Sequence, residues 1–453
     1  MLFRVENLGP VRQAEVDLSK DLILLTGPNS TGKTYVAWSV YGLHRAPNAP
    51  EAFRRLADEI LTCPKQEVGF DRVVALWPSL LDAIAAHFTE RLHLCFAAER
   101  QRFADVKVTL RAGRDEPVRA TDFQMGRPVA GVTLHLVLDT HLSLALFAAS
   151  SPRTPGVAPD PVAFSQLPPG AQEAVAAALG ESLAVALMTA CWPRCTLLPT
   201  ERTAIDLFAR ELSVLRTDLV GRVIEAELDP GAVTTSTTRD VGRYPWPIQD
   251  SLRKANDLAF LGRWKSTFAD LATDLETVLG GAVSVSSEGA IGFAPTGLSA
   301  PLGIHLTSSV VKSLAPLVFY LRHLAREGDL LMIDEPELNL HPDNQRKVAR
   351  LLVKAVNRGL KLMMSTHSDY LLREINNLIL LSRDTGAVRQ VREKLGYTES
   401  ELLAPEKVGV YLFKDGGAEA VPVTAEGFEV STIEEEINRM NAVSQQIYAA
   451  LYE

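Results

Sequence analysis

The chain has 453 residues, of which 47% are hydrophobic and 22% charged, and this composition is typical of a globular protein of two or three domains. A chain of this length buries a large core, so collagen-like, disordered and small disulfide-stapled classes are excluded. Acidic residues outnumber basic ones by 55 to 46, and the net charge of -9 argues against a surface dominated by contacts to a nucleic-acid backbone.

Cysteine usage and hydropathy indicate the compartment. No CxxC pair and no Cys/His cluster at zinc spacing occurs, so we expect ordinary thiols in a reducing environment. The four cysteines are Cys63, Cys95, Cys191 and Cys195. The first residues lack the pattern of a secretory signal, and the most apolar window, residues 174–192, is interrupted by glycine and glutamate, which favours a buried helix over a membrane span. We therefore predict a cytoplasmic protein without membrane contacts.

The amino-terminal residues predict a strand, a loop and a helix. Residues 3–18 alternate apolar and polar side chains around a Gly-Pro turn, which indicates a β-hairpin. Residues 22–26 are apolar up to a threonine, as expected of a central parallel strand covered on both faces. From residue 33 the pattern favours a helix that ends near the prolines at 47 and 50.

The middle third combines helical and strand-like segments. Its expected elements are helices over 51–105, strands over 106–110 and 132–138, a surface loop over 152–169, a helix over 171–192, a strand at 196–198 and a helical zone over 201–279. No repeat at a fixed period and no sustained heptad pattern occurs, so long coiled-coil arms are excluded.

The last third alternates strands and helices again. Its expected elements are a hairpin over 283–293, a helix over 310–326, a strand at 330–333, a helix over 342–357, a strand at 361–365, a helix over 370–376, a hairpin over 408–423 and an amphipathic helix over 432–452. Alternation at both chain ends predicts an α/β fold with a mainly parallel sheet, helices on both faces and the middle third as an insertion.

Residues 27–34, GPNSTGKT, match the G-x-x-x-x-G-K-[ST] phosphate loop at every position, between an apolar strand and a helix. The members of this loop are Gly27, Pro28, Asn29, Ser30, Thr31, Gly32, Lys33 and Thr34. The glycines let the backbone wrap closely around phosphate oxygens, so that amides and the helix N-terminus face the anion. Lys33 is predicted to supply a point charge to the β- and γ-phosphates, and the Thr34 hydroxyl to ligate Mg²⁺.

Two carboxylates follow the apolar strand at 330–333. Asp334 and Glu335 would lie at the carboxyl edge of the sheet, next to the phosphate loop. We expect Asp334 to hold the hydration shell of Mg²⁺ and Glu335 to polarise the attacking water as the general base.

The segment EPELNLHP at 335–342, together with Asp334, resembles the second nucleotide motif of ABC-type ATPase heads of the SMC, RecF and OLD group. The opening residues 3–34 are similar to the hairpin and phosphate loop of these heads. Residues 365–368, STHS, resemble their switch segment, which implies that His367 contacts the γ-phosphate. The resemblance implies an ABC-type P-loop ATPase head with a mainly parallel sheet, an antiparallel β subdomain and an inserted helical lobe.

In that family a second subunit offers a serine- and glycine-rich signature to the γ-phosphate across a head-to-tail dimer. The corresponding residues here are Ser308 and Ser309, which could cap a helix and aim its dipole at the partner's nucleotide. Valine stands at 310 where the family has glycine, which limits how closely the backbone approaches and puts the turnover rate in question.

Residues 198–203, LPTERT, resemble a P-[AST]-E-R segment of these ATPases, where the sheet meets the helical lobe. Glu201 and Arg202 could lie near the nucleotide or form a surface salt bridge, and the two interpretations are equally open. Gln249 is a weak candidate for the glutamine that such heads place beside the nucleotide.

The expected domain boundaries follow from the resemblance. They are an amino-terminal part of the head (1–50), an inserted helical and antiparallel region (51–194), a helical lobe (195–280), the carboxyl-terminal part of the head (281–390) and a hairpin and helix that act as a docking element (391–453).

The resemblance implies an ATP hydrolase that dimerises around ATP and Mg²⁺, with hydrolysis resetting the dimer. The residues after 381 carry no acidic triad of a nuclease, so the chain looks similar to stand-alone ATPases of anti-phage systems of the AriA and PtuA types, which control a separate effector protein. Three alternatives stay open: a RecF-like DNA-repair ATPase that binds duplex DNA, a transporter's nucleotide-binding subunit, and an ATP-binding scaffold with little turnover.

Overall fold

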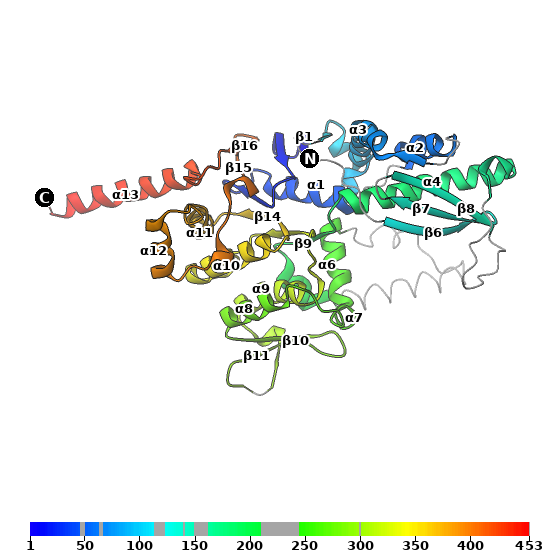
Figure 1. The fold of residues 1–453 in the computed structure, drawn as a ribbon. Helices are drawn as coiled ribbons and strands as arrows, with labels where there is room; N and C mark the ends of the chain where they lie inside the picture. Colours follow the sequence, from blue (N-terminus) through cyan, green and yellow to red (C-terminus); the bar gives the residue numbers. More distant parts are fainter. Residues whose placement is uncertain are drawn as a thin grey trace, which may run out of the picture.

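The computed structural model describes residues 1–45, 50–62, 67–112, 123–138, 141–148, 162–209, 244–298 and 300–452. A nine-stranded sheet runs through the molecule (Figure 1). From one edge to the other its strands are β5 (Lys107–Arg111), β1 (Leu2–Leu8), β2 (Val11–Asp17), β16 (Gly417–Val421), β15 (Val408–Lys414), β3 (Leu22–Thr26), β14 (Lys361–Thr366), β13 (Leu330–Asp334) and β9 (Cys195–Leu198).

The five strands from β15 to β9 are parallel, whereas β5, β1 and β2 pair antiparallel. Every residue of β3 is buried, because Leu22 and Leu24 pack into the core on one face of the sheet and Ile23 and Leu25 into the core on the other. This confirms the predicted α/β fold with a mainly parallel sheet, the amino-terminal hairpin and the central strand.

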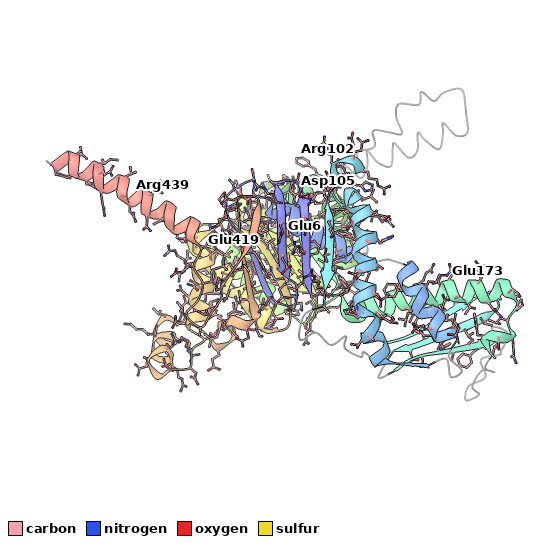
Figure 2. The ribbon with its side chains drawn as sticks, turned by 90° about the horizontal axis from the view of Figure 1, so that it is seen from above. Glu6, Arg102, Asp105, Glu173, Glu419 and Arg439 are labelled. Carbon is pink, nitrogen blue, oxygen red and sulfur yellow. The ribbon has the colours of Figure 1, made fainter. Side chains whose placement is uncertain are left out.

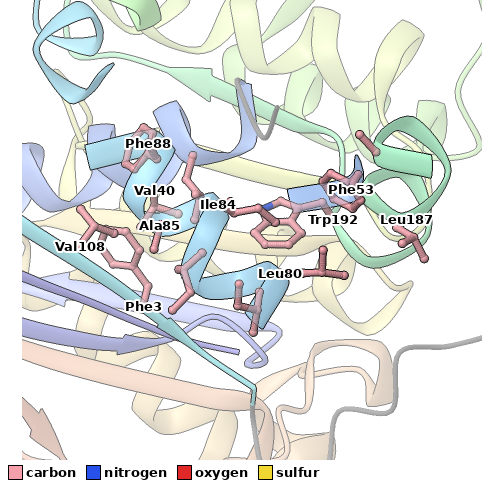
Figure 3. Close-up of a cluster of buried hydrophobic side chains, with 14 of the residues drawn as sticks. Phe3, Val40, Phe53, Leu80, Ile84, Ala85, Phe88, Val108, Leu187 and Trp192 are labelled. Atoms are coloured by element: carbon pink, nitrogen blue, oxygen red, sulfur yellow. The ribbon is translucent and has the colours of Figure 1, made fainter. Parts of the chain in front are cut away.

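One core lies beneath the helices α1 (Lys33–Arg45), α2 (Pro50–Thr62), α3 (Phe70–Cys95) and α4 (Pro169–Cys191). Figure 3 shows part of this core, where aromatic and aliphatic side chains from sheet and helices interdigitate. The labelled side chains are Phe3, Val40, Phe53, Leu80, Ile84, Ala85, Phe88, Val108, Leu187 and Trp192. Close packing of this kind is the main source of helix stability in a domain.

The other core is covered by helices from the last third of the chain. They are α8 (Ala269–Leu279), α9 (Ser309–Phe319) with a π-helical turn over Tyr320–Leu324, α10 (Pro342–Asn357) and α11 (Asp369–Leu380). These helices confirm the predicted pattern, except that the helix expected over 310–326 changes to π-helical geometry at Tyr320. A helical segment at 202–209, α6 (Trp246–Asn256) and α7 (Leu258–Leu261) lie in the predicted helical zone.

Two smaller antiparallel sheets complete the fold. One contains β4 (Glu67–Gly69), β8 (His141–Ala148), β7 (Val132–Leu138) and β6 (Phe123–Val129), and the other β10 (Gly281–Val285), β11 (Ile291–Pro295) and β12 (Leu302–Gly303). The predicted strand at 132–138 and the hairpin over 283–293 are confirmed, whereas the other strands of the four-stranded sheet were not predicted. Parts of the expected loop over 152–169 and of the helical zone over 201–279 lie outside the described residues, as does Cys63.

The carboxyl-terminal hairpin is part of the large sheet. The expected hairpin within residues 391–453 is present, and β15 pairs in parallel with β3 while β16 continues the sheet towards β2. The docking role expected for this segment stays a prediction. The first six residues of β15 are buried, so an apolar strand of this kind needs a cover on both faces and finds it inside the sheet.

Helix α13 (Ser431–Tyr452) confirms the predicted terminal helix and projects from the body, as Figure 2 shows for Arg439. Helix α12 (Gly386–Leu395) was not predicted, because its sequence is mostly polar, although Thr385 caps its start and Gly396 ends it in a left-handed conformation. Among the described residues no helix has the length and apolar character needed to cross a membrane.

Candidate functional site

The phosphate loop follows β3 and leads into α1, at the carboxyl edge of the parallel strands. Gly27, Ser30 and Gly32 have φ angles of 131°, 63° and 99°. Left-handed residues of this kind curve a backbone into a concave nest whose N–H groups can face one anion. Thr31 fixes the loop from within, because its Oγ1 donates to the carbonyl of Pro28 at 2.9 Å.

Both glycines are required by close packing. A Cβ at Gly27 would lie 2.2 Å from the carbonyl oxygen of Phe413 in β15, and a Cβ at Gly32 would lie 2.2 Å from Cγ2 of Val11 in the β1–β2 hairpin. The loop is therefore held between two hairpins that are more than 390 residues apart in the chain.

Lys33 is the buried cation of the loop, with only 5% of its surface exposed. Its Nζ donates to the carbonyls of Gly27 at 2.9 Å and Pro28 at 2.7 Å. Burial lowers its pKa to about 8, against the opposing effect of the nearby carboxylates, of which Glu335 has the largest. A buried ammonium held by neutral carbonyls gains from an anion beside it, so the loop fits a phosphate group.

Asp334 ends β13 and is 2% exposed. Its Oδ1 accepts from Ser365 Oγ at 2.8 Å, and its Oδ2 accepts from Trp38 Nε1 at 3.0 Å. Burial raises the Asp334 pKa to about 6, although both hydrogen bonds oppose this shift. Thr34 is exposed and lies one helical turn before Trp38 on α1, the helix that contacts Asp334. An oriented carboxylate and a hydroxyl from this helix fit the way phosphate-bound Mg²⁺ is held, through one or two protein oxygens and water. Trp38 had not been singled out from the sequence.

Glu335 and His367 face each other beside the loop. His367 Nε2 lies 3.9 Å from Glu335 Oε1, and both side chains are about one-third exposed. Burial and the charge of Lys33 lower the His367 pKa, whereas Glu335 and the carbonyl of Gly27 raise it. The structure thus brings Lys33, Asp334, Glu335 and His367 together at one edge of the sheet; their catalytic roles stay predictions.

No role was predicted for Glu337, which lies close to the switch segment. Its Oε1 accepts from Thr366 Oγ1 at 2.8 Å and from the backbone N–H groups of His367 at 2.7 Å and Ser368 at 3.1 Å. Burial raises its pKa. Glu337 therefore fixes the backbone that carries His367. Its position inside the EPELNLHP segment was the signal that could have identified it.

Arg202 is 3% exposed and donates to backbone carbonyls instead of a carboxylate. The surface salt-bridge interpretation is therefore wrong for Arg202, because burial excludes it. Glu201 is exposed. Gln249 lies at the start of α6, where its Nε2 donates to the carbonyl of Tyr244, and nothing in these contacts joins it to the phosphate loop.

Ser308 is the N-cap of α9, and its Oγ accepts from the Val311 N–H at 3.4 Å. Ser308 and Ser309 are both exposed. Their observed contacts join them to their own helix and not to the phosphate loop of the same chain. Among the described residues, the N-terminus of α9 is thus accessible at Ser308 and Ser309.

Residues 262–372 match the family model AAA_15, described as an AAA ATPase domain. This segment is similar to AAA ATPase domains. It covers about a quarter of the chain and includes Ser308, Asp334, Glu335 and His367. A search of curated proteins finds no match.

Among solved structures, an SMC head domain from Thermotoga maritima matches with 11% identity and a TM-score of 0.31, covering 93% of this chain and 98% of that one. An Smc head domain with an extended coiled coil, bound to the C-terminal domain of ScpA from Pyrococcus furiosus, matches with 12% identity and a TM-score of 0.32, covering 96% and 98%. An SmcHead bound to the C-winged helix domain of ScpA matches with 11% identity and a TM-score of 0.36, covering 93% and 96%.

Proposed function

We propose that this chain binds ATP with Mg²⁺, dimerises head to tail around two nucleotides and hydrolyses ATP to ADP and phosphate. The observation that carries the proposal is the convergence of a complete phosphate loop, Asp334, Glu335 and His367 at the carboxyl edge of a parallel sheet. The match of residues 262–372 to AAA ATPase domains supports it.

Each residue has a distinct part in the proposed reaction. The loop amides and Lys33 bind the β- and γ-phosphates, while Thr34 and Asp334 hold Mg²⁺, which when bound neutralises phosphate charge. Glu335 accepts a proton from the attacking water as the general base. His367, whose lowered pKa favours the neutral imidazole, donates a hydrogen bond to the γ-phosphate.

The second half of the site is proposed to come from another subunit. The exposed N-terminus of α9, capped by Ser308, carries the positive end of a helix dipole and suits a γ-phosphate. Because each ATP would contact both subunits, nucleotide binding shifts the population from open monomers to the closed dimer. Hydrolysis removes the γ-phosphate, and the dimer then opens again.

The test uses Glu335→Gln, which keeps the shape of the site and removes the general base. With saturating ATP and Mg²⁺, light scattering should show this variant at twice the monomer mass. The matched control, Lys33→Ala combined with Glu335→Gln, should stay monomeric. A Glu335→Gln protein that binds ATP and remains a monomer would contradict the proposal.

The biological role is proposed to be control of a separate effector protein in the cytoplasm, in the manner of anti-phage defence ATPases. Helix α13 supports a partner, because it projects from the head and exposes Met440, Ile447 and Leu451. Deleting residues 431–453 should leave ATP hydrolysis intact and abolish effector control in cells, with loss of hydrolysis arguing for a structural role of the helix.

A DNA-repair function of RecF type makes a different prediction. A cleft of about 990 Å³ beside β1 and β5 mixes basic Arg100, Lys107 and Arg111 with acidic Asp82 and Glu90, and so offers no continuous basic groove. Linear duplex DNA should therefore leave the ATPase rate unchanged. Stimulation of the ATPase rate by DNA that falls steeply with salt concentration would favour the DNA-repair function. A wild-type ATPase rate no higher than that of Glu335→Gln would favour the alternative of an ATP-binding scaffold with little turnover.

A further inference from the structure

The guanidinium of Arg202 joins three elements at the back of the site. Arg202 begins the helical segment after β9, and its Nη1 donates to the carbonyls of Pro199 at 3.0 Å and Asp334 at 2.7 Å. Its Nη2 donates to the carbonyl of Glu335 at 2.8 Å, and its Nε donates to the carbonyl of Ser313 in α9 at 2.9 Å. One planar side chain thus links the end of β9, the end of β13 and α9.

Glu335 needs such support because its backbone is strained. Its φ of 50° lies in the left-handed region, which side chains other than glycine rarely adopt. Its N–H donates to the Ser365 carbonyl at 3.0 Å, and its own carbonyl accepts from Arg202. The Glu335 carbonyl also accepts from the Leu338 N–H at 3.1 Å. Arg202, Ser365 and Leu338 therefore hold the backbone from which the Glu335 side chain projects.

A second link meets the same residue of α9. Asn339, which also has a positive φ of 63°, donates from Nδ2 to Ser313 Oγ at 3.0 Å. Ser313 is 1% exposed and lies five residues after the helix cap at Ser308. A displacement of α9 therefore acts on both ends of the segment from Glu335 to Asn339.

Building on the proposed function, we propose that Arg202 is a positioning residue that couples α9 to the backbone of Glu335. Contact between the α9 N-terminus and the partner subunit's nucleotide would then set the general base of the same chain. None of the four hydrogen bonds of Arg202 goes to the phosphate loop, and Arg202 contacts Asp334 only through the backbone carbonyl. The Asp334 carboxylate proposed to hold Mg²⁺ is oriented by Trp38 and Ser365 instead, so we expect nucleotide binding to change little when this link is lost.

The test compares Arg202→Lys with Arg194→Lys in the full chain. Lysine keeps the charge but cannot span carbonyls on three elements. Arg194 is a matched control, because it precedes β9, pairs with Asp329 and donates to the Leu324 carbonyl at the opposite end of the strand. We expect kcat to fall by about tenfold or more in Arg202→Lys alone, with the ATP Kd nearly unchanged, since small misplacements of a base have large effects on rate.

A second variant tests the coupling if Arg202→Lys does not fold. Asn339→Gly keeps the left-handed backbone and removes the link to Ser313 at an exposed position. It should lower kcat by about threefold at unchanged Kd. Equal kcat values in Arg202→Lys and Arg194→Lys would overturn the coupling. So would a variant in which ATP affinity, kcat and the folded fraction all fall together.

Hydrogen exchange separates the failure of this coupling from the failure of the proposed function. Without nucleotide, Arg202→Lys should speed exchange across residues 334–340 and leave residues 27–34 unchanged. Unchanged exchange at 334–340 would refute the link even in an active enzyme. If the wild-type chain neither hydrolyses ATP nor dimerises, the proposed function fails while the exchange result still decides the link.

Discussion

The phosphate loop with its neighbouring strands and the N-terminus of α9 are the two halves of the proposed ATP site, and they differ in how many contacts their side chains make within the chain. At the phosphate loop both charged groups are buried: Lys33 donates to carbonyls of the loop itself, and Asp334 accepts from Trp38 of α1 and Ser365 of β14. At α9, Ser308 and Ser309 are exposed, and Ser308 holds only the first turn of its own helix. One half of the proposed site is therefore built within a single subunit. The other half, the N-terminus of α9, is a surface that is proposed to contact the nucleotide of a second subunit.

The largest expected effect is on the complete half. Lys33→Ala removes the buried ammonium and should weaken ATP binding by about a hundredfold, measured by calorimetry. Lys361→Ala, which removes a lysine that donates to the Ser19 carbonyl away from the site, is the control and should bind ATP normally. Comparable losses in both variants would mean that Lys33 acts through folding alone.

A negative charge at the N-terminus of α9 tests whether this surface contacts the partner's nucleotide. Asparagine and aspartate both cap helices well, but Ser308→Asp places a negative charge where the γ-phosphate of the partner would lie. Ser308→Asp should lower hydrolysis by about tenfold or more without changing ATP affinity of the monomer, and Ser308→Asn should not. Mixing Ser308→Asp with Lys33→Ala should restore activity, because the mixed dimer contains one intact composite site. Absence of recovery at ATP concentrations that assemble the dimer argues against shared sites.

The pH dependence of ATP affinity tests the role of Lys33 in the phosphate loop. The Lys33 pKa is lowered to about 8, so free protein loses this proton above pH 8, whereas a bound phosphate keeps the ammonium charged. ATP affinity should therefore fall by up to about tenfold per pH unit above pH 8, with proton uptake on binding. In the unliganded fold the same shift means that the free energy of unfolding rises as pH increases from about 8 towards the ordinary lysine value. Lys33→Arg, which stays charged, should give a flat affinity profile over this range.

The smallest expected effect concerns Val310. Replacing it with glycine should let the helix backbone approach the partner's nucleotide and raise kcat by about two- to threefold, while lowering the free energy of unfolding by about 0.5–1 kcal/mol. Val310→Ala is the control, because it shortens the side chain without freeing the backbone. Steady-state hydrolysis and thermal unfolding measure both effects, and a lower kcat in Val310→Gly would show that the valine aids turnover.

The residues whose types are restricted by phosphate and metal chemistry could be predicted from the sequence. GPNSTGKT and the pair Asp334 and Glu335 follow apolar strands, and the structure gathers them at one edge as parallel strands require. Trp38 and Glu337 were not singled out, because their partners, the Asp334 carboxylate and three donors of the switch segment, are remote in sequence. Arg202 was left between two interpretations, because the carbonyls of Ser313, Asp334 and Glu335 to which it donates are also remote in sequence. Such contacts are fixed by proximity in the fold, and no local spacing encodes them.

The carboxyl-terminal hairpin shows the same division. The apolar run from Val408 and the turn residues Asp415, Gly416 and Gly417 indicated that residues 408–421 fold as two strands. Only the tertiary structure decided that β15 lies beside β3 and that the Phe413 carbonyl presses on Gly27, because strand pairing across the chain depends on which buried faces meet. The sequence by itself thus determined the elements and the phosphate chemistry, whereas long-range packing decided which strand supports the loop and which arginine holds Glu335.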